Sequence, residues 1–282
     1  MGIKNQLKTV LFLGILTALL LWIGSFWGKT GIFIGLIFAF IMNFSAYWFS
    51  DKLVLAMYGA KEIKENDYPK LYRLVKEVVQ LAKIPMPKLY IIHTSTPNAF
   101  ATGRNPKHAA IAVTTGIIEL LNEEELKAVI AHEISHIKHR DTLIQTIAAT
   151  IAGVIAYIAM IARWQALFGS HDRDRGSALE LLILAIITPI IATLIQLAIS
   201  RSREFLADEG SAKLLHNGIY LANALEKLEL GVKHSPFRAT TTAQATAHLF
   251  IVNPFRATNL IKLFMTHPPT NERIKRLREL KL

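Results

Sequence analysis

The 282-residue sequence contains no cysteine. This excludes a disulfide framework and any metal site with a thiolate ligand, so a bound metal ion must be held by histidine and carboxylate side chains. Acidic residues are also few, 21 against 32 lysines and arginines, which gives a formal net charge of +11. The basic residues are dispersed and flank apolar segments. We therefore expect contact with a lipid bilayer and not with nucleic acid.

The chain is too apolar for an ordinary soluble enzyme, since 52% of its residues are hydrophobic and its mean hydropathy is +0.33. Four segments of 18 to 23 residues are almost free of charge, which is the length that crosses the hydrocarbon core of a membrane. They are residues 10–27, 32–49, 143–162 and 178–200, with Glu180 as the one acidic exception. None has a polar face wide enough for water, which disfavours buried helices of a large soluble core.

These segments divide the chain into two predicted transmembrane hairpins and two soluble parts. The hairpins are residues 1–50 and 143–200, and the soluble parts are residues 51–142 and 201–282. Lysines before the first segment and after the second favour a cytoplasmic location for both termini and both soluble parts, with the loop 163–177 on the opposite side. The first segment is too long for a signal peptide and lacks a convincing cleavage site, so we expect it to be retained.

The first soluble part is predicted to contain a helix and a small β-sheet. The helix should begin near Asp67 and bury one apolar stripe. The stripe consists of Leu71, Leu74, Val75, Val78, Val79 and Ala82. Residues 89–93 and 109–114 are apolar runs of strand length, and the turn residues within 96–106 indicate a meander.

The motif around which the chain is organised is His132-Glu133-Ile134-Ser135-His136. Four residues make about one helical turn, so both histidines project from one face of a helix and can hold one metal ion. Glu133 lies beside that face, where its carboxylate can take a proton from water. A zinc ion lowers the pKa of water to about 7 and polarises a peptide carbonyl, as amide hydrolysis requires. Asn122 and Glu125 form a predicted capping box, so the helix should start near Glu123.

The third metal ligand is predicted downstream of the second hairpin. Glu204 follows the last apolar segment, and the two intervening segments return the chain to the side of the histidines. Asp208 shares the helical face of Glu204 and can accept a hydrogen bond from the non-ligating nitrogen of a ligand histidine. The alternative for Glu204 is a surface salt bridge with a neighbouring arginine. His139 shares the face of the two histidines, but it lies about 10.5 Å along the helix from His132 and is not expected to bind the same ion.

The remaining sequence predicts two helices and a loop. Residues 209–231 are predicted to be helical with Gly231 just past the helix end, and a basic amphipathic helix runs to the end of the chain. Residues 232–258 have no clear period and are expected to form a loop or lid over the cleft. His93 and His108 are expected to be surface or packing residues.

These motifs resemble those of the HtpX-type membrane zinc endopeptidases, which are grouped with the prenyl-protein (CAAX) endopeptidases. The resemblance covers essentially the whole chain. It rests on residues 132–136, 203–208 and 98–103, and on His267-Pro268-Pro269 followed by Arg273. It implies a mainly α membrane protein, with four transmembrane helices and a cytoplasmic zincin-like α+β metalloprotease domain that contains a small β-sheet.

The resemblance also implies the roles of individual residues. One Zn²⁺ per chain is held by His132, His136 and Glu204, with Glu133 as the general base and Asp208 orienting a ligand histidine.

Three further residues are implied to contact the substrate. Asn98 lies on an edge strand with which a substrate backbone pairs, and His267 and Arg273 face the cleft and steady the substrate or the oxyanion. The implied role is quality control of misfolded or damaged membrane proteins at the cytoplasmic face of the prokaryotic inner membrane. The expected partners are thus membrane-protein or peptide substrates and the lipid bilayer.

Three alternatives are weighed against this hypothesis. A site-2-type intramembrane protease is disfavoured by the charged residues that surround the histidine motif. Prenyl-protein processing is disfavoured because the relatives that perform it have more membrane spans than the four predicted for this chain. A non-catalytic membrane scaffold would not need the intact Glu133.

Overall fold

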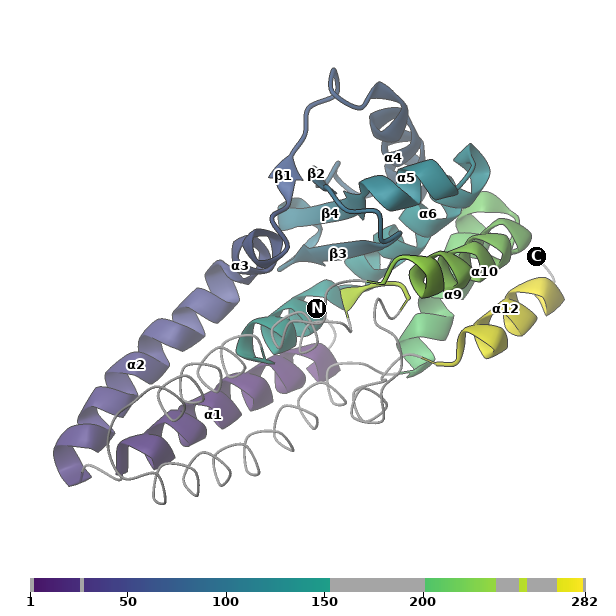
Figure 1. Cartoon of the computed structure of the whole chain (residues 1–282). Helices are drawn as coiled ribbons and strands as arrows, with labels where there is room; N and C mark the ends of the chain where they lie inside the picture. Colours follow the sequence, from purple (N-terminus) through teal and green to yellow (C-terminus); the bar gives the residue numbers. More distant parts are fainter. Residues whose placement is uncertain (1–2, 26–27, 153–200, 237–248, 253–267, 281–282) are drawn as a thin grey trace.

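The computed structural model describes residues 3–25, 28–152, 201–236, 249–252 and 268–280 (Figure 1). Two long helices at the N-terminus, α1 (Ile3–Ser25) and α2 (Gly28–Trp48), lie side by side and extend away from a mixed α/β unit. A hydrogen bond of 2.8 Å from Asn43 Nδ2 to Thr17 Oγ1 joins them. At their turn, a Cβ atom on Gly24 would lie 2.4 Å from the carbonyl oxygen of Gly31, so a glycine is required there.

The structure confirms only part of the predicted membrane layout. Within the described residues, α2 is the one helix that is long and apolar enough to cross a membrane. The apolar part of α1, Thr9–Trp22, and the helix at Thr142–Ala152 are shorter. The second half of the third predicted segment, residues 153–162, and all of the fourth, residues 178–200, lie outside the described residues, so four transmembrane helices are not confirmed.

The sheet has four strands in the order β1-β2-β4-β3. They are β1 (Lys61–Glu62), β2 (Lys88–Ile92), β3 (Ala99–Gly103) and β4 (Ala109–Thr114). β2 and β4 are parallel, whereas β1 pairs with β2 and β3 pairs with β4 in antiparallel fashion.

The predicted meander is therefore wrong. The segment between the two apolar runs is not only a turn, because it contributes β3, and the 3₁₀ turn η1 (Pro106–His108) returns the chain antiparallel along β4. Thr114 holds the start of β3: its backbone N–H donates to Asn98 O and its hydroxyl accepts from Asn98 N. Because β3 is last in the strand order, it is an edge strand of the sheet.

Helices cover one side of this sheet and form the main core. α4 (Pro69–Ala82) and α5 (Thr115–Leu120) precede α6 (Glu123–His139). α6 contacts α4, β3, α9 (Arg201–Leu215) and α10 (Ile219–His234). All six residues of the predicted stripe on α4 are buried, which confirms that prediction. The short helix α3 (Ser50–Met57) connects α2 to the sheet (Figure 1).

The C-terminal part contributes α9 (Arg201–Leu215), α10 (Ile219–His234) and α12 (Thr270–Glu279). The predicted single helix over residues 209–231 is wrong, because the helix is interrupted where His216 has a φ of 51°. The break is packed tightly: a Cβ atom on Gly218 would lie 2.5 Å from the carbonyl oxygen of Leu277 in α12. Gly231 lies inside α10, where a Cβ atom would meet the Pro97 ring at 2.7 Å.

Two further predictions about the C-terminal region are corrected or remain open. The last helix ends at Glu279 and not at the chain terminus, because Leu280 adopts an extended backbone. The start of the predicted loop or lid, residues 232–234, is helical, and residues 237–248 and 253–258 lie outside the described residues.

Candidate metal centre

Helix α6 places the two motif histidines next to each other. Its N-terminus is fixed by the predicted capping box: Asn122 Oδ1 accepts from Glu125 N at 2.9 Å, and Glu125 Oε2 accepts from Asn122 N at 3.1 Å. One turn apart, His132 and His136 point their Nε2 atoms at each other across 3.2 Å. The sequence prediction of a shared face is confirmed.

Glu204 on α9 completes the cluster, as predicted. Its Oε2 lies 3.7 Å from His132 Nε2 and its Oε1 lies 3.5 Å from His136 Nε2. One ligand atom from each of the three residues lies within 4.8 Å of the others. The three side chains are buried, with exposures of 1%, 4% and 1% for His132, His136 and Glu204. The alternative of a surface salt bridge for Glu204 does not fit a buried side chain.

The donor atoms fit a tetrahedral metal ion. Two nitrogens that each lie about 2.0–2.1 Å from a tetrahedral zinc are about 3.3 Å apart, close to the observed Nε2 separation. Nδ1 of His132 faces the Asp208 carboxylate, and Nδ1 of His136 faces that of Asp141. Each carboxylate places the ring proton on Nδ1 and leaves a lone pair on Nε2. Burial also lowers the pKa of His132 to about 4, so its ring is neutral at pH 7 and able to bind a metal. Converging lone pairs beside a carboxylate make a site for a cation.

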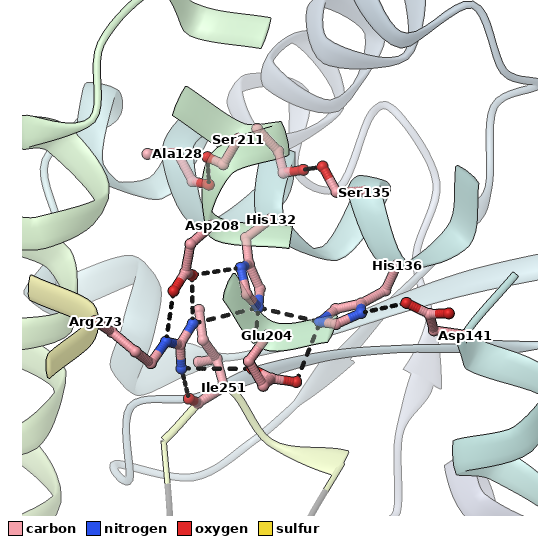
Figure 2. Close-up of polar contacts among 11 residues, drawn as sticks. Ala128, His132, Ser135, His136, Asp141, Glu204, Asp208, Ser211, Ile251 and Arg273 are labelled. Atoms are coloured by element: carbon pink, nitrogen blue, oxygen red, sulfur yellow. Dashed lines mark hydrogen bonds and ion pairs between the residues drawn. The ribbon is translucent and has the colours of Figure 1, made fainter. Parts of the chain in front are cut away.

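Asp208 holds His132 from the side opposite the cluster. Its Oδ1 lies 3.0 Å from His132 Nδ1, as the sequence predicts (Figure 2). Arg273 binds the same carboxylate at two points, through Nε to Oδ2 at 2.9 Å and through Nη2 to Oδ1 at 2.7 Å. Burial alone would raise the pKa of Asp208, but the Arg273 charge holds it below its usual value.

Arg273 is itself deeply buried, with 2% of its surface exposed. Besides Asp208, its Nη1 donates to the carbonyl oxygen of Ile251 at 3.0 Å and lies 3.6 Å from Glu204 Oε2. The structure thus places Arg273 beside the ligands, whereas its contact with substrate stays a prediction. The companion residue His267 lies outside the described residues.

Asp141 is a neighbour of the cluster that the sequence analysis missed. Its Oδ2 lies 3.4 Å from His136 Nδ1, and its other carboxylate oxygen pairs with Arg203. The helix ends at Arg140 in a left-handed conformation, and Asp141 N donates to His136 O at 3.0 Å, so the chain folds back toward the histidine. An aspartate five residues after the second histidine was the available signal, but it stood in a run of basic residues.

Glu133 lies beside the cluster and not in it. It is buried, and the backbone N–H of Ala101 in β3 donates to its carboxylate. Burial raises the pKa of Glu133 to about 8. Its carboxylate is therefore a stronger base than that of a solvent-exposed glutamate, which suits a group that takes a proton from water and later returns it.

The other histidines named from the sequence lie apart from the cluster. His139 is exposed at the end of α6 and does not belong to the metal-binding group found among the described residues. His93 and His108 are also exposed, in agreement with the prediction that they are surface or packing residues.

The edge of β3 is in contact with a segment from the C-terminal part. Ile251 N donates to Ala99 O at 3.2 Å, and Asn98 Nδ2 donates to Val252 O at 2.8 Å. Phe250 packs its ring against Tyr58 and Phe100. The predicted pairing of a substrate backbone with the Asn98 strand is not tested by these contacts.

Comparison with known proteins adds an independent result. A sequence profile of Peptidase family M48 matches residues 65–281. A "Protease HtpX homolog" from Syntrophotalea carbinolica is 51% identical over 277 residues, covering 97% of this chain and 98% of the relative. The homolog from Pyrococcus furiosus is 50% identical over 283 residues, with 99% and 97% covered.

A solved structure supports the fold. The crystal structure of S. mikatae Ste24p superposes with a TM-score of 0.51 at 16% identity, covering 98% of this chain. This chain spans 66% of the length of that protein. The extent of the sequence matches, together with the two histidines and the glutamate in one buried cluster, shows that the chain belongs to Peptidase family M48, among the relatives named protease HtpX homologs.

Proposed function

We propose that the protein is a zinc-dependent endopeptidase of the membrane, with His132, His136 and Glu204 as the metal ligands. The observation that carries this proposal is the buried cluster itself, with Glu133 held next to it. A zinc ion in this cluster would supply a Lewis acid that polarises a peptide carbonyl and acidifies water.

The surrounding residues have separate tasks in peptide hydrolysis. Glu133 takes a proton from water and returns it to the leaving amine, and the Ala101 N–H keeps its carboxylate oriented. Asp208 and Arg273 keep His132 in the tautomer whose Nε2 points into the cluster. The Arg273 charge lies near enough to Glu204 to favour negative charge in the site.

A catalytic role explains this arrangement better than a scaffold does. A scaffold requires only the metal ligands, whereas here a buried carboxyl that binds none of the other cluster atoms is held beside them. Burying Glu133 costs free energy, and a hydrogen bond from the β3 backbone offsets part of that cost.

We place four membrane spans, at about 10–27, 32–49, 143–162 and 178–200, with the catalytic part and both termini in the cytoplasm. Support comes from the end of α2. The Arg104 guanidinium lies 4.3 Å from the Trp48 ring centre, and the Lys52 ammonium lies 5.5 Å from that of Phe49. Exposed aromatic rings paired with basic groups are typical of a membrane–water boundary. The sheet would then lie just outside that boundary.

The substrates we propose are misfolded or damaged membrane proteins of a prokaryotic inner membrane. A protease anchored beside the bilayer encounters such chains at high local concentration. The substrate backbone would add to the β3 edge near Asn98, with His267 and Arg273 at the cleft.

The proposal is tested with the full chain purified in detergent and a quenched-fluorescent peptide library. Wild type should cleave peptides, lose activity to a zinc chelator and regain it with added zinc. Glu133→Gln should keep its zinc and lose at least about 100-fold in cleavage, as expected for a missing general base. Cleavage by Glu133→Gln within a few-fold of wild type would sink the mechanism.

A further inference from the structure

Each ligand histidine faces an aspartate that pairs with an arginine, although the sequence predicts an aspartate partner only for one of them. The Nδ1 atom of His132 faces Asp208, which pairs with Arg273. The Nδ1 atom of His136 faces Asp141, which pairs with Arg203. Figure 2 shows the two carboxylates on opposite sides of the histidine pair.

We propose that Asp141 and Arg203 are positioning residues that orient His136 for metal binding. A carboxylate on Nδ1 fixes the ring tautomer and orientation and makes Nε2 a better ligand. Asp141 is 4% exposed, so its charge requires a partner, and Arg203 supplies one. The inference rests on the proposed metal-dependent function.

The pair also joins the two elements that provide the ligands. Asp141 follows the end of α6, and Arg203 precedes Glu204 in the first turn of α9. A contact between them holds the His136 ring and the Glu204 backbone in a fixed relation. Ligand geometry should therefore depend on Arg203 even though Arg203 is not a ligand.

The Asp141–Arg203 pair is more exposed than the Asp208–Arg273 pair, so substitutions in it are better tolerated. The Arg203 side chain is 19% exposed and that of Arg273 is 2% exposed. Replacing Arg203 can therefore admit water to Asp141, so variants of Arg203 should fold. Their effect should appear in the metal site.

The experiment measures zinc affinity of the full chain in detergent by competition with a chromophoric chelator. Asp141→Ala and Arg203→Met should each bind zinc about 10- to 100-fold more weakly than wild type. Asp141→Asn keeps the shape and one acceptor oxygen, so it should lose less and covers the case in which Asp141→Ala does not fold. Arg203→Lys keeps the charge and should partly restore affinity.

Two readouts separate positioning from general damage. The visible absorption of the Co²⁺-loaded protein reports ligand geometry, and it should change in Asp141→Asn and Arg203→Met. The double variant Asp141→Ala/Arg203→Met should bind no more weakly than Asp141→Ala, because Arg203 acts through Asp141. As matched controls, Glu209→Gln and Lys213→Met break an exposed ion pair on the same helix and should leave affinity and spectrum unchanged.

Three outcomes would overturn the inference. One is that Asp141→Ala binds zinc within about twofold of a wild type that itself binds zinc tightly. Another is that the affinity losses of Asp141→Ala and Arg203→Met add up in the double variant. A Co²⁺ spectrum that is unchanged in both variants would also contradict it. All three leave the proposed function intact, whereas a wild-type chain that binds neither zinc nor cobalt would end both proposals.

Discussion

Asp208 and Arg273 form a buried ion pair with two hydrogen bonds, 2.9 Å and 2.7 Å long, and the same carboxylate lies 3.0 Å from Nδ1 of His132. The pair joins α12, near the C-terminus, to the metal-binding helix α6 through α9. A substitution in α12 that breaks this pair should therefore lower the free energy of unfolding and also alter the metal centre.

Arg273→Met should destabilise the fold. It leaves Asp208 buried without its cationic partner, and breaking a buried pair in this way costs about 3–5 kcal/mol. Chemical denaturation in detergent measures the loss. Arg278→Met is the matched control on the same helix, because its pair with Glu226 is exposed, and exposed pairs contribute about 0–1 kcal/mol. Equal losses in both variants would contradict the account.

Gly218→Ala should weaken the contact between the α9–α10 break and α12. The added Cβ atom would lie 2.5 Å from the Leu277 carbonyl oxygen, a backbone atom that cannot rotate away. Overpacking of this kind costs about 1–3 kcal/mol, measured as a lower free energy of unfolding. Gly14→Ala, where nothing lies within 4 Å, serves as the control and should not destabilise the chain. The packing argument fails if the two variants are equally stable.

His139→Ala should leave the zinc content unchanged. His139 is exposed at the end of α6, and its rise along the helix carries it about 10.5 Å from His132. His136→Ala, one turn earlier on the same face, should lose most of the metal. Elemental analysis of the two purified variants compares them directly, and metal loss in His139→Ala would show that the site extends further along α6.

The proposed topology can be tested because the chain has no cysteine. Single cysteines at Ser95, Ser235 and Ser170 report three segments when labelled with a maleimide that does not cross membranes. Ser95→Cys and Ser235→Cys should label from the same side in sealed vesicles, and Ser170→Cys should label from the opposite side. Labelling of Ser95→Cys and Ser235→Cys from opposite sides would refute an even number of intervening spans.

The parts of the site that follow from helical spacing could be predicted from the sequence. His132 and His136 share a face by periodicity alone, and Asp208 lies one turn after Glu204. The capping box located the start of α6 for the same reason, since its two residues are three positions apart. Each of these relations is local, so the backbone geometry of one helix determines it.

The parts that were missed depend on backbone conformations or on contacts between distant segments. Asp141 reaches His136 only because Arg140 adopts a left-handed conformation, and non-glycine residues seldom do so. The break at His216 has the same cause. The sequence predicts a turn at β3 because its five residues lie among turn formers, whereas pairing with β4 makes them a strand. The burial of Arg273 against Asp208 joins residues 65 positions apart.

The most direct test of the metal centre is the zinc content of Glu204→Ala beside wild type. Three protein ligands are the usual set for a catalytic zinc, so removing Glu204 leaves two histidines that should bind zinc far more weakly. Elemental analysis of the purified full chain after dialysis should give about one zinc per wild-type chain and a small fraction of that in Glu204→Ala. Full zinc occupancy in Glu204→Ala would contradict the assignment of the third ligand, and the proposed active site would be wrong with it.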